Sequence, residues 1–350
     1  MGTVVQFTGT REVALADVAD PDLAPREVRV ETLYSGISAG TELTAYRGSN
    51  PYLAKRWDGE RRLFVGGDGP TLSYPVEGWG YEECGRVVEV GAAVEAVAEG
   101  DVVYGTWGHR SHAVLPEERA LGRLPDARDP IVGVFSRIGA IALNGVLDAD
   151  IHVGEHVAVF GQGVPGLIVT QLARLNGASV IALDAIPARL ELSRRLGADH
   201  VVDVTREDAG AAVKQLTGGR GADVSIEISG SYAALGAAVR ATAYNSRVVA
   251  CGFYQDEARG VYLGEEFHHN RIAVVCSQIS GVRTDLAHRW DLARLERTVM
   301  ALEAAERIDL RALISHVLPY ERAADAFRLL DEEAANTVQV VLDYRDARAT

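Results

Sequence analysis

Hydrophobic residues follow two different patterns along this chain of 350 residues. In residues 1–128, short valine-rich runs alternate with glycine, proline and aspartate, and the runs read VVQFTG, EVRVETLYSG, GRVVEVGAAV and DVVYGTWG. Runs of this length between turn residues are typical of β-strands. The pattern predicts an antiparallel, barrel-like β domain over this part of the chain.

From His156 onward, apolar runs alternate with segments that have a helical pattern. The runs read HVAVF, VIALD, HVVDV, DVSIEIS, SRVVACG and RIAVVCSQ. Between two of them, PARLELSRRLGA begins with Pro187, a residue that suits the first turn of a helix. Alternating strands and helices predict an α/β domain with a doubly wound parallel sheet, the Rossmann arrangement.

The C-terminal part of the chain has two helix-like stretches and one strand-like stretch. LARLERTVMALEAAER and HVLPYERAADAFRLLDEE are followed by TVQVVLDY. This last run comes too late to join the parallel sheet, so we expect it to return to the N-terminal domain. We therefore place the dinucleotide-binding domain at residues 129–284 and the β domain at residues 1–128 and 285–350.

The turn after HVAVF contains the glycine pattern GQGVPG, which is typical of dinucleotide binding. Gly161 permits a tight turn, Gly163 lets a pyrophosphate approach the backbone, and Gly166 lets the next helix pack against the strand. The pyrophosphate would lie at the helix N-terminus beside Val164 and Pro165, where free N–H groups favour an anion.

The residues that follow the next strand bear on the choice between NAD and NADP. Asp184 lies about 20 residues beyond the glycines, where a carboxylate bonds to the ribose 2′-OH and would repel a 2′-phosphate. Arg189 is a candidate phosphate partner, although its helix also suits a solvent-facing role. We expect NAD as the cofactor. Further contacts should come from the carboxyl ends of later strands, which are Ser229, Gly230, Gly252, Phe253, Ser277 and Gln278.

Composition and charge exclude several classes of function. The formal net charge is −14, which argues against binding to nucleic acid or anionic membranes, because both need clustered Lys and Arg. We find no uninterrupted run of about 18 apolar residues. The start, MGTVVQFTGTREV, lacks the pattern of a secretory signal, so we expect a cytoplasmic protein. The 3 cysteines lie far apart and form no C-x-x-C pair, so they predict neither a disulfide framework nor a structural zinc site.

The order of these parts resembles the medium-chain dehydrogenase/reductase superfamily, in which a Rossmann sheet is inserted in a GroES-like β domain. GRVVEVG, EHVAVFGQGVPGLIVTQLARLNGASVIALD, RLGADHVVD and ERAADAFRLLDEE look like landmarks of that family. SGISAGTE, FHHNRIAVVCSQ and the pair Arg289-Trp290 look most like its bacteriochlorophyllide dehydrogenase-like branch. One departure is the order of Val164 and Pro165, which is exchanged relative to the common turn.

The resemblance also identifies the positions where zinc-dependent members hold their catalytic metal. The first position, a Cys in those members, is here Ser38 or Ala39, depending on where one residue is inserted. The second, a His in a GHE stretch, is Tyr81, and the third falls near Arg137. A catalytic Zn²⁺ needs three N, S or O⁻ ligands, so these residues predict that the protein uses no metal. The four-Cys lobe of structural zinc is also absent.

Without zinc, a side chain must accept the alcohol proton or stabilise the developing alkoxide. Tyr81 is the first candidate, with Arg137 as the cation that would lower its pKa. Thr41 aligns with the hydroxyl that relays a proton in zinc-dependent relatives, and Glu82 is placed to orient Tyr81. His112 has a side chain suited to proton shuttling. Each residue also suits a purely structural role: Tyr81 a packed aromatic ring, Thr41 a turn hydroxyl, Glu82 a surface carboxylate and His112 a hydrogen-bonded histidine.

The resemblance implies a zinc-independent, NAD-dependent oxidoreductase that interconverts a secondary alcohol and a ketone. The substrate would be a small biosynthetic intermediate, cyclic or polyhydroxylated, bound between the two domains. Two alternatives stay open: an NADPH-dependent enone or quinone reductase, against which Asp184 argues, and a non-catalytic dinucleotide-binding protein. The apolar strand IAVVCSQ at the sheet edge predicts a homodimer formed by sheet extension.

Overall fold

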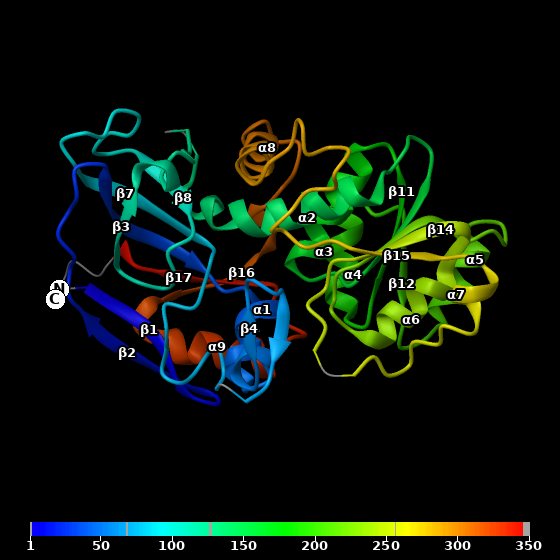
Figure 1. The fold of residues 1–350 in the computed structure, drawn as a ribbon. Coiled ribbons are helices and arrows are strands. Elements are labelled where there is room, and N and C mark those ends of the chain that lie inside the picture. The colour runs from blue at the N-terminus through cyan, green and yellow to red at the C-terminus, as the bar shows by residue number, and fades with distance from the viewer. Residues whose placement is uncertain (1, 68, 126–127, 256, 346–350) are drawn as a thin grey trace. The chain divides into compact units, whose positions relative to one another are not determined.

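The computed structural model describes residues 2–67, 69–125, 128–255 and 257–345 (Figure 1). The chain forms two compact units, one from Met1–Arg137 with Ile314–Thr350 and the other from Ile138–Leu313. Each unit has a hydrophobic core of its own. The chain therefore has the inserted arrangement that the sequence predicts, with different boundaries.

The first unit is built from β-sheets, as the valine-rich runs predict. One sheet has the strand order β2-β1-β6, a larger one has the order β16-β17-β3-β7-β8 with β9 also paired to β3, and β4 and β5 form a hairpin. The strands are β1 (Gly2–Gly9), β2 (Glu12–Val18), β3 (Glu27–Gly36), β4 (Arg56–Asp58), β5 (Leu63–Val65), β6 (Val76–Glu77), β7 (Glu83–Val90), β8 (Val102–Gly105), β9 (His112–Pro116), β16 (Ile314–Pro319) and β17 (Gln339–Asp343).

Strand β17 pairs antiparallel with β3, so the C-terminal return to the first unit is confirmed. The preceding stretch HVLPYERAADAFRLLDEE divides into strand β16 and helix α9 (Ala323–Glu332). Helix α1 (Ala39–Arg47) lies in the same unit, with the short helical turns η1 (Pro51–Leu53), η2 (Glu117–Arg119), η3 (Pro130–Phe135) and η5 (Tyr320–Arg322). The ring of Phe327 on α9 packs edge-on against Phe7 of β1 at 4.9 Å between centroids, which fixes α9 on the core.

The second unit is a six-stranded parallel sheet in the order β12-β11-β10-β13-β14-β15, so the predicted doubly wound sheet is confirmed. Helices α3 and α4 pack on one face and α5 and α6 on the other (Figure 1). The elements are β10 (His156–Phe160), α3 (Val164–Leu175), β11 (Ser179–Asp184), α4 (Pro187–Arg195), β12 (His200–Asp203), α5 (Ala209–Leu216), β13 (Ala222–Glu227), α6 (Tyr232–Ala241), β14 (Thr242–Ala250), α7 (Glu266–His269) and β15 (Ala273–Cys276).

Residues 285–313, which the sequence analysis assigned to the β domain, belong to the second unit. They contain α8 (Leu292–Ala304) and the turn η4 (Arg311–Leu313). Val299 of α8 is fully buried and packs so closely on Gly139 that a Cβ there would lie 2.5 Å from Val299 Cγ1. The correction follows from this tertiary packing, which the amphipathic pattern of α8 alone does not specify.

Helix α2 (Ser136–Ala149) continues directly from η3 and completes a helical stretch, Pro130–Ala149, of 20 residues. By length and composition this stretch is apolar enough to cross a membrane, but most of it is buried inside the protein, as in the core helices of globular proteins. The stretch is not an uninterrupted apolar run in the sequence, because Arg137 and Asp148 lie within it.

Candidate dinucleotide site and hydroxyl cluster

The glycine-rich turn lies between β10 and α3 in the second unit. Gly161 has a φ of +94°, a left-handed conformation that favours glycine. A Cβ at Gly166 would lie 1.8 Å from the carbonyl oxygen of Gly161, so only glycine permits this approach of helix and strand. By contrast, a Cβ at Gly163 would meet nothing closer than 4.0 Å, which leaves open space at the N-terminus of α3. This is the geometry that a pyrophosphate needs.

Asp184, at the end of β11, is held by the backbone on both sides of its carboxylate. Its Oδ2 accepts a hydrogen bond of 2.6 Å from the N–H of Gln162, and its Oδ1 accepts one of 2.8 Å from the N–H of Ile186. The carboxylate thereby joins the glycine-rich turn to the end of β11. The residues of the motif thus come together as the sequence predicts.

Arg189 does not lie on a solvated helix face, which was one reading of its sequence. The residue is partly buried, and a Cβ at Gly163 would lie 4.0 Å from its Nη1, so the guanidinium reaches the glycine-rich turn. Burial lowers the pKa of Arg189, and the charge of Asp184 opposes that shift. A cation therefore lies beside the position expected for the phosphates.

The carboxyl ends of β13 and β14 are organised around Glu227, which the sequence analysis did not single out. Its carboxylate accepts hydrogen bonds from the N–H of Ser229 at 2.9 Å, from the N–H of Gly230 at 3.3 Å and from the hydroxyl of Tyr254. Burial raises the pKa of Glu227. Its signal in the sequence is a carboxylate at the carboxyl end of a largely buried strand.

The remaining predicted contacts lie near the same strand ends. Gly252 packs on the turn at Gly230, because a Cβ at Gly252 would lie 2.3 Å from the Gly230 nitrogen. Phe253 is 42% exposed, and Ser277 accepts a hydrogen bond of 3.4 Å from Asn144. Gln278 accepts from the N–H of Ser280 at 2.7 Å. The sheet topology thus explains why residues distant in sequence gather at one edge.

In the first unit, three hydroxyl groups lie together. The Tyr81 hydroxyl is hydrogen-bonded to Ser38 Oγ and lies 3.4 Å from Thr41 Oγ1. Ser38 is the N-cap of α1, which presents Thr41 one turn later. Of the two readings of the first aligned position, Ser38 is therefore the residue that faces Tyr81.

The pKa of Tyr81 is raised, not lowered as the sequence analysis expected. Burial is the main cause, and the charge of Glu82 acts in the same direction, whereas the hydrogen bonds from Ser38 and Thr41 oppose the shift. Arg137 lines the same cavity as Tyr81 but does not reverse this balance. The phenol is thus held in its neutral form, which can donate a hydrogen bond.

Behind the hydroxyl cluster lies a buried group of acids with one histidine. Glu42, Glu82 and Glu83 are all fully buried, and His109 is 1% exposed. His109 Nδ1 lies 2.5 Å from Ser35 Oγ, and Glu42 Oε1 accepts from the N–H of Ser38 at 2.8 Å. The sequence analysis singled out Glu82 but not its buried neighbours Glu42 and Glu83, because GTE and YEE resemble loop sequence.

Glu82 is not a surface carboxylate. Its Oε2 accepts a hydrogen bond of 3.2 Å from Gln339 Nε2 on β17. Burial raises the pKa of Glu82 well above its ordinary value, and the charges of Glu42 and Glu83 add to that shift. Glu82 therefore favours a proton in the folded chain.

A cavity of ≈ 670 Å³ opens beside Tyr81 in the first unit, and both His112 and Trp107 line it. His112 Nδ1 lies 3.0 Å from Ser111 Oγ. The indole of Trp107 donates to Thr32 Oγ1 at 2.9 Å and is buried. The volume is within the range of small-molecule sites.

The residues at the aligned zinc positions do not fit that metal. Ser38 and Tyr81 use their hydroxyls in a mutual hydrogen bond, and Arg137 brings a permanent positive charge to the cavity that Tyr81 lines. Catalytic zinc sites are built from imidazole, thiolate and carboxylate ligands, none of which these three positions supply. In the described ranges, no group of three or more His, Cys, Asp or Glu has an arrangement suited to a metal ion.

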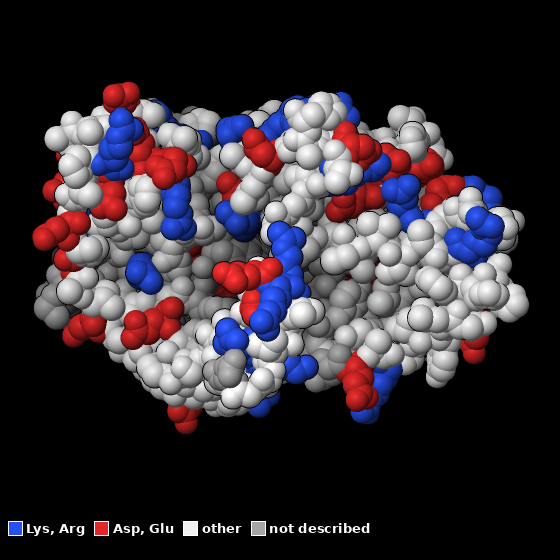
Figure 2. All heavy atoms as spheres, viewed as in Figure 1, with Lys and Arg blue, Asp and Glu red and all other residues white. Residues whose placement is uncertain are grey.

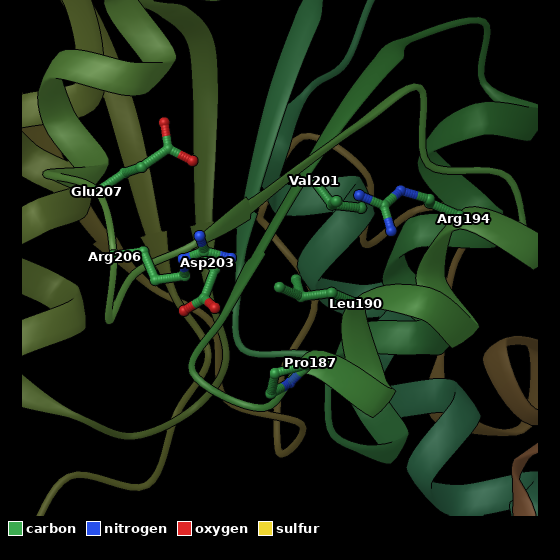
Figure 3. Close-up of a pocket in the computed structure, with 7 residues that line it drawn as sticks. All are labelled: Pro187, Leu190, Arg194, Val201, Asp203, Arg206 and Glu207. Carbon is green, nitrogen blue, oxygen red and sulfur yellow. The ribbon is translucent and has the colours of Figure 1, made fainter.

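A groove of ≈ 510 Å³ lies elsewhere in the second unit, between α4 and the edge strand β12 (Figure 3). Pro187 and Leu190 come from the helix and Asp203 from the strand end. None of the predicted dinucleotide residues lines it. On the face drawn in Figure 2, acidic and basic side chains are interspersed, in keeping with a surface that forms no single basic field.

The chain is similar in sequence to several known proteins. A family model described as zinc-binding dehydrogenase matches residues 165–293. D-guloside 3-dehydrogenase of Escherichia coli (strain K12) is 30% identical over 345 residues, which cover 96% of this chain and 98% of that protein. (R,R)-butanediol dehydrogenase of Bacillus subtilis (strain 168) is 26% identical over 303 residues, covering 78% of this chain and 81% of that enzyme. The homologues are thus alcohol and polyol dehydrogenases.

Solved structures agree in fold. A candidate zinc-binding dehydrogenase from Sinorhizobium meliloti 1021, bound to NADP, aligns with a TM-score of 0.79 at 23% identity over 98% of this chain and 99% of that one. At this identity the match shows the fold alone. With relatives at 30% identity along 96% of its length, the chain belongs to the medium-chain, zinc-type alcohol dehydrogenase-like superfamily of dinucleotide-dependent oxidoreductases.

Proposed function

We propose that this chain is a zinc-independent, NAD-dependent dehydrogenase that interconverts a secondary alcohol and a ketone. The observation that carries the proposal is the hydrogen-bonded pair Ser38–Tyr81, which stands at two of the aligned zinc positions. In zinc-dependent relatives the metal polarises the substrate oxygen; here two hydroxyls occupy that place. The relatives that are D-guloside and butanediol dehydrogenases support the reaction type.

The reaction requires a hydride acceptor and a path for one proton. Bound NAD would supply the acceptor, since alcohol oxidation moves hydride from the carbinol carbon to the nicotinamide. Neutral Tyr81 donates a hydrogen bond to the substrate oxygen, where negative charge develops. In alcohol oxidation Tyr81 accepts the alcohol proton as it passes its own proton to Thr41, whose oxygen lies 3.4 Å away, and the partly buried Thr41 releases a proton to solvent; ketone reduction reverses these transfers.

The choice of NAD rests on Asp184. Its carboxylate is fixed by two backbone N–H groups at the end of β11, where it would accept from a ribose 2′-OH and repel a 2′-phosphate. Arg189 argues in the opposite direction, and the S. meliloti fold neighbour holds NADP. We favour NAD because the Asp184 carboxylate lies at the end of β11, where the adenosine ribose is expected. Arg189 reaches the glycine-rich turn, so its charge can serve the pyrophosphate and does not require a 2′-phosphate.

The physiological setting is a further part of the proposal. We infer a role in a biosynthetic pathway of the cytoplasm, as in the bacteriochlorophyllide dehydrogenase-like branch, without nucleic-acid or membrane partners. Strand β15 lies at one end of the parallel sheet, with Val274 42% exposed, which supports a homodimer formed by sheet extension.

The test is a turnover screen with NAD and NADP against secondary alcohols and polyols, including 2,3-butanediol, glucitol and myo-inositol, with a chelator present. We expect NADH formation with at least one polyol. Reduction of enones or quinones by NADPH, with no alcohol oxidised, would replace this proposal by the reductase alternative. Dinucleotide binding without any turnover would favour a non-catalytic protein.

A further inference from the structure

The cavity beside Tyr81 is lined by three arginines from separate segments of the first unit: Arg110, Arg119 and Arg137. His112 also lines it, and among the described residues Asp20 is the one carboxylate in its wall. Arg29 lies 3.8 Å from that carboxylate and offsets its charge. A chain with a net charge of −14 thus gathers positive charge at the wall to which Tyr81 of the hydroxyl cluster contributes.

Arg110 is the least compensated of these cations. Within the described residues it forms no ion pair, and its buried Nε has no hydrogen-bond acceptor. Its guanidinium lies directly over Gly78, because a Cβ there would be 2.4 Å from Arg110 Nη2. Burying part of a guanidinium without a counter-ion is unfavourable, so the site is arranged for an anion that the protein itself does not supply.

Arg119 and the surrounding backbone complete the wall. Arg119 is exposed and donates to the carbonyl oxygen of Thr106 at 2.5 Å and to Thr106 Oγ1 at 3.1 Å. In the part of the chain that the structure describes, no carboxylate pairs with it, in contrast to Arg328, which pairs with Asp325 at 2.7 Å. Arg119 is therefore held in place by neutral acceptors, which leave its positive charge at the cavity uncompensated.

We propose that the alcohol substrate carries an oxyanion, a phosphate monoester or a carboxylate, which Arg110 and Arg119 bind while the reacting hydroxyl lies at Ser38 and Tyr81. This inference rests on the proposed function and defines its substrate class as an anionic polyol. A guanidinium forms two parallel hydrogen bonds to either oxyanion, so the shared chemistry is bidentate recognition. A cavity of ≈ 670 Å³ has room for a small polyol with one such group.

The experiment has a binding arm and a turnover arm. In the binding arm, inorganic phosphate and gluconate are titrated into the full chain by calorimetry, and into Arg110→Gln and Arg328→Gln. We expect Arg110→Gln to weaken oxyanion binding roughly 10- to 100-fold, the scale of losing hydrogen bonds to a charged group. Arg328→Gln should match the unaltered chain, because that arginine is ion-paired on the surface of α9.

The turnover arm compares glucitol, gluconate and glucitol 6-phosphate with NAD. We expect a lower KM for at least one anionic member, raised in Arg110→Gln with little change in kcat. Arg110→Lys should give an intermediate KM, because it keeps the charge and loses the bidentate geometry. Preference for the phosphate or the carboxylate identifies the oxyanion.

The outcomes separate this inference from the proposed function. Oxidation of neutral glucitol with equal or better kcat/KM than both anionic members, together with oxyanion binding that Arg110→Gln leaves unchanged, overturns the inference and leaves the dehydrogenase proposal standing. If no alcohol is oxidised, the proposed function fails, whereas the binding arm still decides whether the arginines form an oxyanion site.

Discussion

The imidazole of His109 and the carboxylate of Glu42 lie 2.5 Å apart, between Nε2 and Oε2, in the interior of the first unit. The other ring nitrogen faces Ser35, so the ring is fixed on both sides. Although burial lowers the pKa of His109, the charge and hydrogen bond of Glu42 outweigh it, and the pKa is raised overall. The folded chain therefore favours the protonated imidazole, and the pair holds the N-terminus of α1 by way of the hydrogen bond from the N–H of Ser38 to Glu42.

We predict that His109→Gln lowers the free energy of unfolding by about 3 kcal/mol, because it leaves a buried carboxylate without its cation. Since the pKa of His109 is raised on folding, its contribution is complete below the ordinary value of 6.5 and is lost as pH rises through the folded pKa. Urea unfolding at several pH values measures both effects. His152→Gln is the matched control, because that side chain is 72% exposed, and an equal loss in both variants would contradict the prediction.

Glu82 should also make the stability of the folded chain depend on pH. Its raised pKa means that the folded chain retains a proton which the unfolded chain has released above about 4.5, so stability falls as pH rises. We predict that Glu82→Gln is more stable than the unaltered chain at pH 8 and that this gain shrinks toward pH 5. Thermal unfolding in a pH series checks it. Glu89→Gln, at an exposed ion pair with Arg29, should show no such trend, and a gain independent of pH would reject the explanation.

The dinucleotide half of the protein was largely predictable because each of its signals is local. Gly161, Gly166 and Asp184 lie within one strand-turn-helix-strand unit, where steric and charge requirements fix residue types at fixed spacing. The doubly wound parallel sheet then follows from the alternation of strands and helices. Glu227 escaped prediction because its partner Tyr254 lies 27 residues away and is brought to it by the tertiary fold.

The hydroxyl cluster of the first unit, with the buried glutamates behind it, was predictable only in part. Resemblance selected Tyr81 and Thr41, but the raised pKa of Tyr81 arises from burial, which no local pattern encodes. Glu82 needs Gln339, a partner 257 residues away, for its hydrogen bond. Likewise, α8 joins the second unit through the packing of Val299 on Gly139. The hydrogen bond of Glu82 and the packing of α8 are both contacts between segments distant in sequence.

We predict that the purified chain contains no stoichiometric zinc. Ser38, Tyr81 and Arg137 offer two mutually bonded hydroxyls and a cation where three metal ligands would be needed. Elemental analysis of protein prepared without chelator measures this directly, with a zinc-dependent alcohol dehydrogenase as the positive control. One tightly bound zinc per chain, or activity that a chelator removes and zinc restores, would contradict it.

Asp184 should set the cofactor preference. We predict that NADH binds more tightly than NADPH by about 10-fold or more. This is the scale of one hydrogen bond to a charged group, and repulsion between the Asp184 carboxylate and the 2′-phosphate of NADPH acts in the same direction. Asp184→Ala should narrow this gap, because Arg189 then faces a 2′-phosphate without the competing carboxylate. Fluorescence titration with both cofactors gives the ratio. Asp203→Ala, at the neighbouring strand end in register with Asp184, is the control and should keep the preference.

The last prediction concerns the hydroxyl that faces the substrate oxygen. Tyr81→Phe removes that hydroxyl and keeps the ring, so folding and dinucleotide binding should survive. Turnover should fall on the order of 10²-fold, the usual effect of losing a positioned acid or base. Steady-state kinetics with the substrate from the screen measure the loss, and Tyr320→Phe, whose ring stacks on Tyr344, controls for the substitution itself.

Parallel variants then assign the remaining roles. Ser38→Ala should lower turnover as well, because it removes the hydrogen-bond partner of Tyr81, and Thr41→Ala should lower it if the proton leaves by that hydroxyl. His112→Ala tests the alternative shuttle in the same cavity. If Tyr81→Phe turns over at the rate of the unaltered chain while His112→Ala does not, the proton passes through the imidazole, and Tyr81 serves only to shape the cavity wall.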